Sequence, residues 1–305
     1  MCAYQPTRDQ ENGMRMRIML LGADSLLGQA VVQLAAQDGI AVAAPQTPVG
    51  GWQSSELAAL FAAHTPDCVV NLTYYHEQFQ LGSCDDATLA AIRDFNLVLI
   101  KQCAERHTLL LQLSSARVFD GLKQSPYVEK DELAPGDALG KLQSELEGRL
   151  QTSCERHLLL RLSWVLDSSA DGQLGKLIGQ LCSKQPVLLA EEWRGNPTPV
   201  ADAARVIMAL LKQLDCAAPL YGVYHYGSSE VSSWISFAKS LAQELMASKR
   251  LDHDPLIRSV PFDQQTDTAW EPQNAALASR RVLMSFGIKP RAWRSQLSEL
   301  LRQFD

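Results

Sequence analysis

Residues 16–28 read MRIMLLGADSLLG and contain the turn that decides the fold. A short apolar run ends at Gly22, and helical apolar spacing begins at Leu26 and continues to residue 36. Another short apolar run covers residues 40–44, so the stretch predicts a strand, a tight turn, a helix and a second strand. A glycine turn in this context is typical of proteins that bind a dinucleotide at the helix N-terminus.

Beyond residue 44, short apolar runs continue to alternate with longer amphipathic stretches. The predicted strands cover residues 68–72, 108–113, 157–164, 186–189 and 222–226. The predicted helices cover residues 54–63, 86–106, 138–151, 174–183, 200–214, 233–247 and about 291–304. This alternation predicts an α/β fold, with a doubly wound parallel sheet of Rossmann type and helices on both faces.

The alternation loosens after residue 165, and residues 250–275, rich in Asp, Gln and Pro, are predicted to be irregular. We therefore expect a disordered N-terminal extension over residues 1–15 and a dinucleotide-binding lobe over residues 16–165. A smaller lobe is expected over residues 166–305, with segments that return to the sheet.

The composition excludes several classes of protein. Of 305 residues, 46% are hydrophobic and 20% are charged, which is ordinary for a globular chain and excludes a disordered or fibrous one. The net charge of −6 argues against a nucleic-acid partner, and no apolar run approaches the roughly 18 residues of a membrane span. Seven cysteines without a CxxC pair, behind a polar N-terminus, predict reduced thiols in a cytoplasmic protein. The histidines lack metal-ligand spacing, so no metal is predicted.

The glycine turn matches a dinucleotide site only in part. Gly22 permits the tight turn, Gly28 lets helix and strand pack closely, and the backbone of Leu26 and Leu27 at the helix N-terminus faces the expected pyrophosphate. Ser25 stands where a glycine is preferred; its hydroxyl is able to donate to a phosphate, but its Cβ narrows the approach. The end of the second strand, AVAAPQTP, has neither the acid that binds the ribose of NAD nor an arginine for NADP. NAD, NADP and a site that has lost its cofactor therefore all stay open.

Seven segments of the chain, taken in their order and spacing, form a pattern that is specific for one family. They read MLLGADSLLG (19–28), PDCVVNLTYY (66–75), LLQLSSARVFDG (110–121), LLLRLSWVL (158–166), RGNPTPVADAA (194–204), GVYHYGSSEVSSWISFA (222–238) and PRAWRSQLSELL (290–301). Together they resemble the extended short-chain dehydrogenase/reductases, and within them the dTDP-4-dehydrorhamnose reductase (RmlD-type) family. The resemblance implies a nucleotide-sugar ligand held between the two lobes, and it adds Asn71, Thr73 and Ser114 to the cofactor-binding residues expected from the turn.

That family reduces a keto-sugar with NAD(P)H, using a Ser/Thr, a Tyr, and a Lys four residues after the Tyr. Carried onto this chain, the Ser/Thr is Ser115, but the segment PGDALGKLQSELEG (135–148) places Leu139 at the Tyr position and Gln143 at the Lys position. Leucine has no proton to give, and glutamine has no charge with which to lower the pKa of a partner. Lys141 lies on another face of the predicted helix.

Other positions also depart from the family. Ala116 and Arg117 replace a polar acid and an aromatic residue in SSARVFDG. Glu271 precedes Pro272 where the family has an arginine for the substrate diphosphate, so the charge is reversed.

Two functions remain. The first is a catalytically impaired relative that binds a nucleotide or nucleotide sugar and acts as a regulatory or partner protein. The second is an active NAD(P)H-dependent reductase of a dTDP-4-keto-6-deoxy sugar, or of another nucleotide sugar, with Tyr74, Tyr75 or Tyr127 as the proton donor. A plain metabolite sensor is a variant of the first.

Several residues that match the family have a structural interpretation. Trp164, Trp234 and Trp293 are predicted to pack in the core. His225 is expected to be a hydrogen-bonded structural histidine, and Arg161 to make a buried ion pair or a backbone bond.

Overall fold

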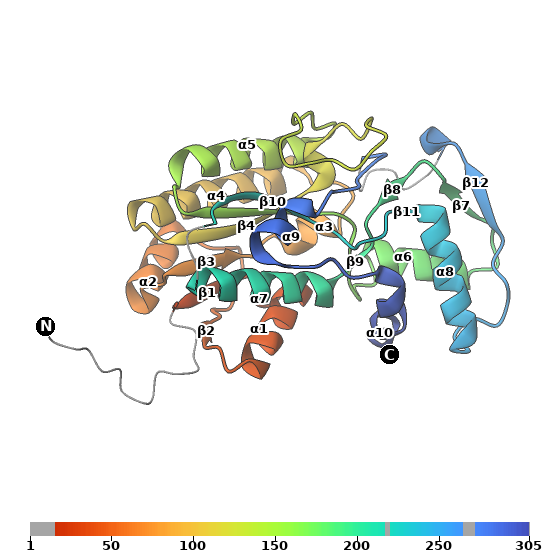
Figure 1. Ribbon diagram of the computed structural model, residues 1–305, viewed down its shortest axis with the longest axis horizontal. Coiled ribbons are helices and arrows are strands. Elements are labelled where there is room, and N and C mark those ends of the chain that lie inside the picture. The colour runs from red at the N-terminus through yellow and green to blue at the C-terminus, as the bar shows by residue number, and fades with distance from the viewer. Residues whose placement is uncertain (1–15, 217–219, 265–271, 305) are drawn as a thin grey trace, which may run out of the picture.

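A parallel sheet forms the centre of the molecule in the computed structural model, which describes residues 16–216, 220–264 and 272–304 (Figure 1). All five pairs of neighbouring strands run parallel. The six strands, in order across the sheet, are β10 (Gly222–Tyr226), β5 (His157–Leu162), β4 (Leu109–Ser115), β3 (Cys68–Asn71), β1 (Ile18–Leu21) and β2 (Val42–Ala43). The predicted Rossmann-type parallel sheet is confirmed.

Helices cover both faces of the sheet (Figure 1). Helices α1 (Leu26–Gln37) and α7 (Val200–Cys216) pack on one face. The other face carries α2 (Ser54–His64), α4 (Asp86–Glu105) and α5 (Ala138–Ser153). Because β1 lies between β2 and β3, the direction of chain progression reverses there, and the carboxyl ends of β1 and β3 open onto the position where such sheets bind ligands.

A second group of short elements packs beside the sheet (Figure 1). Trp164, Trp193 and Trp234 form its core, with ring centroids 5.0 to 5.6 Å apart, and Trp293 lies at one side against Phe237. The predicted packing role of the tryptophans is confirmed. The elements are β6 (Val165–Leu166), α6 (Gln173–Cys182), β7 (Val187–Ala190), β8 (Arg194–Gly195), β9 (Thr198–Pro199), β11 (Ser232–Ser233), α8 (Trp234–Ala247) and β12 (Ile257–Val260).

Three local predictions were wrong. Residues 250–275 are not wholly irregular, because β12 pairs in parallel with β7 and that pairing lies outside the local sequence pattern. The last helix is shorter than expected: Ala292 has extended backbone, a 3-10 turn covers Trp293–Gln296, and α10 covers Leu297–Arg302. Helices α3 (Tyr75–Phe79) and α9 (Arg280–Phe286) were not predicted.

Two predictions lie outside the described residues, namely the disordered extension over residues 1–15 and the reversed charge at Glu271. The division of the chain at residue 165 stays a prediction, although β10 and α7, which follow it, belong to the sheet and its cover.

A buried ion pair ties α5 to the sheet. Arg161 on β5 donates from Nη2 to Glu147 Oε2 at 2.5 Å and from Nε to Oε1 at 2.9 Å, and the two side chains are 3% and 1% exposed. The remaining Arg161 nitrogen, Nη1, lies 3.1 Å from His225 Nε2, and His225 Nδ1 lies 3.1 Å from the carbonyl oxygen of Tyr127. Burial, and then the Arg161 charge, lower the pKa of His225 to about 3, so the ring is neutral. The structural interpretations of Arg161 and His225 are confirmed.

Removing one partner of this ion pair is expected to destabilise the fold strongly. Arg161→Met leaves the Glu147 carboxylate buried without its cation, and Glu147→Leu does the converse, each at a cost of about 3–5 kcal/mol in the free energy of unfolding. The double variant is expected to recover most of the loss, because neither charge is then stranded. Urea unfolding followed by tryptophan fluorescence measures all three; single variants within ~1 kcal/mol of the native chain contradict the assignment.

Candidate functional site

The turn after β1 is held tightly against β3. Gly22 has φ +79°, and a Cβ there would lie 2.4 Å from the backbone carbonyl of Leu72. A Cβ on Gly28 would lie 2.2 Å from the carbonyl oxygen of Gly22. No other residue fits either position without moving backbone, so the turn keeps the close approach that a pyrophosphate-binding turn needs.

Ser25 closes the turn on itself. Its Oγ donates to the Gly22 carbonyl oxygen at 2.7 Å and accepts from the backbone N–H of Gly28 at 3.0 Å, which caps α1. This hydroxyl is bonded to the chain's own backbone in the structure, and its expected role towards a phosphate stays a prediction. Within the described residues, the backbone N–H groups of Leu26 and Leu27 have no acceptor, so the first turn of α1 still presents two donors.

A carboxylate that sequence reasoning missed lies beside the end of β2. Thr47, downstream of β2, donates from Oγ1 to Asp24 Oδ1 at 2.8 Å. The glycine turn itself thus places a carboxylate beside the segment that follows the second strand. Only the fold brings positions 24 and 47 together, so nothing in the local pattern pointed to Asp24.

The cofactor-binding residues expected at the carboxyl ends of β3 and β4 fall into two groups. The side chain of Asn71 is hydrogen-bonded through both of its polar atoms: its Oδ1 accepts from the N–H of Thr73 at 3.2 Å, and its Nδ2 donates to Asn96 at 3.0 Å and to Gln112 at 2.8 Å. In contrast, the hydroxyls of Thr73 and Ser114 are buried without a partner in the described part of the chain. Buried polar atoms without partners are uncommon, and these two suit a bound polar group.

Ser115 is buried and hydrogen-bonded to Gln143, the residue that stands at the Lys position of the resemblance. Its Oγ donates to Gln143 Oε1 at 2.7 Å and accepts from the N–H of Arg117 at 3.2 Å, and the side chain is 0% exposed. Leu139, one helical turn before Gln143, packs with apolar side chains of α4 and α5. Lys141 points away and is exposed, as predicted. The Gln143 Nε2 is a further buried donor without a partner among the described residues.

Arg117 ties the segment that follows Ser115 to two neighbouring parts of the chain. Its buried guanidinium donates from Nε to Asp137 Oδ2 at 3.0 Å and from Nη2 to the carbonyl of Gly82 at 2.6 Å. Asp137 in turn caps α5, because its Oδ1 accepts from the N–H of Gly140 at 2.6 Å. One side chain therefore joins the Ser115 loop, the start of α5 and the loop before α4.

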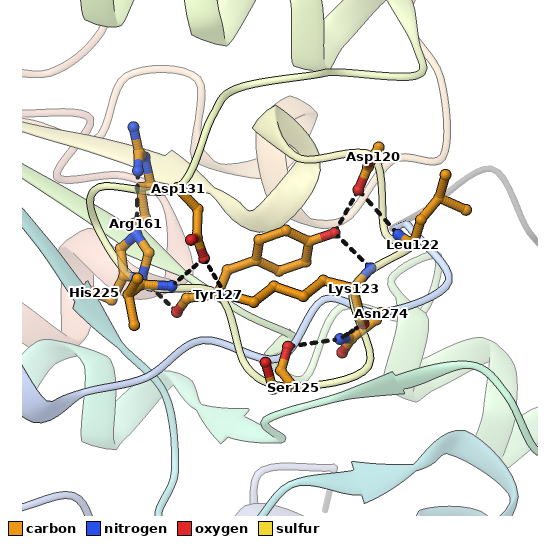
Figure 2. A network of polar contacts seen from close by, with 10 residues as sticks. Asp120, Leu122, Lys123, Ser125, Tyr127, Asp131, Arg161, His225 and Asn274 are labelled. Atoms are coloured by element: carbon orange, nitrogen blue, oxygen red, sulfur yellow. Dashed lines mark hydrogen bonds and ion pairs between the residues drawn. The ribbon is translucent and has the colours of Figure 1, made fainter.

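A phenol and an ammonium group do lie close together elsewhere, in the loop after β4 (Figure 2). Tyr127 donates from its hydroxyl to Asp120 Oδ1 at 2.5 Å and accepts from the backbone N–H of Lys123 at 3.2 Å. The Lys123 ammonium turns to Asp131 at 2.5 Å, and the Tyr127 ring stacks on Phe119. Burial and the Asp120 carboxylate raise the pKa of Tyr127 to about 12. An activated proton donor needs the opposite shift.

The other two tyrosines considered as donors differ from each other. Tyr75 is buried and donates to Asp167 Oδ2 at 2.7 Å, and burial and that carboxylate hold its pKa well above the usual value. Tyr74 is half-buried, packs against the cluster that contains Leu139, and makes no side-chain hydrogen bond in the described part of the chain. Burial raises the pKa of Tyr74 as well.

A polar cavity of about 540 Å³ adjoins the Tyr127 loop. Asn274 braces its wall, donating to the carbonyls of Lys123 and Ser125 (Figure 2). Arg194 is exposed and has no carboxylate partner in the described residues, whereas Arg294 pairs with Glu230. The charged residues of the lining are the cations Lys123, Arg194 and Arg294 and the acids Glu191 and Glu192. Arg194 is the part of this mixed lining that suits an anionic group.

The described residues contain neither a cluster of metal ligands nor a membrane-spanning helix. No three His, Cys, Asp or Glu side chains gather as metal ligands over residues 16–216, 220–264 and 272–304. Over the same ranges, no helix has both the length and the apolar character needed to cross a membrane.

Comparison with known sequences identifies one family. The family model described as RmlD substrate binding domain matches residues 16–305. A dTDP-4-dehydrorhamnose reductase from Aggregatibacter actinomycetemcomitans is 23% identical over 288 residues, which covers 93% of this chain and 98% of that protein. Another from Burkholderia thailandensis is 26% identical over 289 residues, covering 92% and 96%.

Solved structures show the same fold. A dTDP-4-dehydrorhamnose reductase from Clostridium acetobutylicum matches with a TM-score of 0.77 at 20% identity, over 94% of this chain and 99% of that one. The Bacillus anthracis enzyme in complex with NADP matches with a TM-score of 0.76 at 17% identity, over 95% and 100%. A Thermus thermophilus UDP-glucose 4-epimerase complex with NAD matches with a TM-score of 0.74 at 16% identity, over 95% and 99%.

The ionisation of Tyr127 tests whether its phenol is activated. With a pKa of about 12 in the folded chain against about 10 when unfolded, its contribution to stability is complete below pH 10 and is lost as the pH rises towards 12. The difference in phenolate absorbance between the native chain and Tyr127→Phe is therefore expected to titrate near pH 12. A midpoint at or below pH 10 contradicts this and restores Tyr127 as a candidate proton donor.

Proposed function

This chain belongs to the RmlD substrate binding domain family, and we propose that within it the protein binds a nicotinamide dinucleotide and a nucleotide sugar but is impaired in the reductase step. It then acts as a regulatory or partner protein rather than as an efficient enzyme. The observation that carries the proposal is the Ser115–Gln143 hydrogen bond, which occupies the serine hydroxyl, while Leu139, one helical turn earlier on α5, is an apolar residue where an active relative needs a phenol.

The residues around the crevice suit a dinucleotide. The free N–H groups of Leu26 and Leu27 would hold the pyrophosphate, and the unpartnered hydroxyls of Thr73 and Ser114, together with the Gln143 amide, would serve its nicotinamide half. The chemistry that such a cofactor supplies when bound is a hydride for a carbonyl carbon. The chain itself has to bind the cofactor and the sugar, orient them and move one proton. The groups named above suit the binding and the orientation.

The carboxylate of Asp24 favours NAD over NADP. It lies with Thr47 beside the end of β2, where an acid accepts hydrogen bonds from the ribose of NAD. The same negative charge opposes the 2′-phosphate of NADP.

The polar cavity beside the Tyr127 loop supports a nucleotide-sugar ligand. Over the described residues Arg194 has no carboxylate partner, and a diphosphate accepts two parallel hydrogen bonds from such a guanidinium. The cavity adjoins the loop that follows β4, so a ligand seated there extends towards the crevice.

The proton is the missing part. As hydride reaches a carbonyl carbon, the oxygen becomes negative and needs a proton from a positioned acid. Ser115 has committed its proton to Gln143, Leu139 has none, and Lys141 faces solvent. Losing a positioned proton donor costs about 10²–10⁴-fold in rate.

One observation favours a second candidate, an active reductase with Tyr74 as the donor. Tyr74 packs against the cluster that contains Leu139, and its hydroxyl is not bound to a carboxylate, unlike those of Tyr75 and Tyr127. Its raised pKa, caused by burial, opposes this role.

A regulatory role has a physical basis in the two-part architecture. A ligand held between the sheet and the smaller group of elements contacts both, so its binding shifts the population of their arrangements. A partner that prefers one arrangement then responds to the ligand, and its affinity for this chain should differ measurably with and without NADH.

Binding and turnover, measured on the same preparation, test the proposal. Quenching of tryptophan fluorescence by NADH and NADPH is expected to saturate, with tighter binding of NADH. After a dTDP-4-keto-6-deoxy sugar is added, the nicotinamide absorbance is expected to fall about 10²–10⁴-fold more slowly than the ~1–10³ s⁻¹ typical of enzymes would give. Leu139→Tyr/Gln143→Lys is expected to raise the rate above that of the native chain.

Turnover by the native chain in that typical range overturns the proposal. If Tyr74→Phe then abolishes the rate while Tyr127→Phe preserves it, the second candidate is correct. Failure of both nicotinamides to bind removes the cofactor from the proposal and leaves a protein without nucleotide-dependent regulation.

A further inference from the structure

A second cavity, outside the site described above, lies between α7 and the segment that follows α9. It has a volume of about 520 Å³. One wall is a stripe of α7, Arg205, Ala209 and Gln213, spaced four residues apart and therefore on one face of the helix. The opposite wall is residues 286–291.

The charge in this cavity is positive, although the chain as a whole carries −6. Arg205, Lys289 and Arg291 line it. Within the described residues Lys289 has no carboxylate partner, and Arg291, exposed on its side chain to 58%, comes only within 3.9 Å of Asp202. Both exposed cations are therefore available to a ligand.

Asp202, the carboxylate that lies against Arg205 and Arg291, is already hydrogen-bonded within the protein. Asp202 is fully buried, accepts from Arg205 Nε at 2.8 Å and accepts from the Tyr226 hydroxyl at 2.5 Å. A second nitrogen of Arg205 donates to the same Tyr226 oxygen at 2.9 Å. This network fixes Arg205 at the base of the cavity and balances one of the three positive charges, leaving a local excess of two.

The remaining lining is apolar. Phe286 and Ile288 belong to the main hydrophobic core and are 5% exposed each, and Pro290 and Ala209 border them. An anion alone would use only the cations. A ligand that also has an apolar or aromatic part would cover the floor and gain from its removal from water.

We propose that this cavity binds a small phosphorylated molecule, with the phosphate on Arg205, Lys289 and Arg291 and an apolar or aromatic group on the floor made by Phe286, Ile288 and Pro290. The site shares no lining residue with the polar cavity beside Tyr127. It is a second ligand site and does not depend on the proposed function of the first.

Phosphorus NMR and calorimetric titration with phenyl phosphate and with inorganic phosphate test the proposal. Phenyl phosphate is expected to bind saturably and more tightly than phosphate, because it alone covers the apolar floor. Lys289→Ala/Arg291→Ala is expected to weaken its binding by roughly tenfold or more, since a tenfold change corresponds to only about 1.4 kcal/mol.

Lys101→Ala/Arg302→Ala is the matched control, because it also removes two exposed cations, 72% exposed each, neither of which lines the cavity. It is expected to leave the affinity unchanged. Equal weakening in both double variants means that the attraction is only long-range and overturns the site. Weakening by Arg194→Ala instead assigns the binding to the other cavity, and an absence of saturable binding to the native chain overturns the proposal outright.

Discussion

The buried pair between Arg161 and Glu147 sets the rotation of α5, and the candidate reaction centre depends on that rotation. Glu147 lies four residues after Gln143 and eight after Leu139, so the three share one helical face. Fixing Glu147 against β5 turns the whole face towards the sheet. Gln143 is therefore directed at Ser115 at the end of β4, and the exposed Lys141 could not take its place without breaking the ion pair.

Polar groups around the sheet's carboxyl edge are mostly used for structure. The hydroxyl of Ser25 caps a helix, the amide of Asn71 joins three segments, and the guanidinium of Arg117 holds two loops and the start of α5. Among the expected site residues, the buried polar groups without a partner in the described part of the chain are neutral and small: the hydroxyls of Thr73 and Ser114 and the amide nitrogen of Gln143. Neutral donors of this kind bind and orient a polar ligand, but they do not supply a proton at neutral pH. In the proposed function, the chain therefore binds a ligand without efficient proton transfer, because the other polar groups at this edge are already hydrogen-bonded within the chain.

Proximity of a phenol and an ammonium group is not sufficient for acid catalysis. Tyr127 and Lys123 are neighbours, yet each is paired with its own carboxylate, Asp120 and Asp131. Burial, and then the Asp120 carboxylate, favour the neutral phenol and raise its pKa, while Asp131 holds the ammonium group of Lys123.

The sequence by itself determined the fold and the edge of the sheet at which a ligand is expected. Short apolar runs that alternate with amphipathic helices are a local signal, and so are the glycines at 22 and 28, whose backbone leaves no room for a Cβ. It also identified Ser115, Leu139 and Gln143 as the positions to examine, through the order and spacing of the matching segments. Only the tertiary structure decided which hydrogen bonds these residues make, that Asp24 meets Thr47, and that Tyr127 meets Asp120 across a folded loop. The physical reason is that apolar burial depends on a pattern repeated over a few residues, whereas a polar group takes whichever partner the completed fold places within about 3 Å of it.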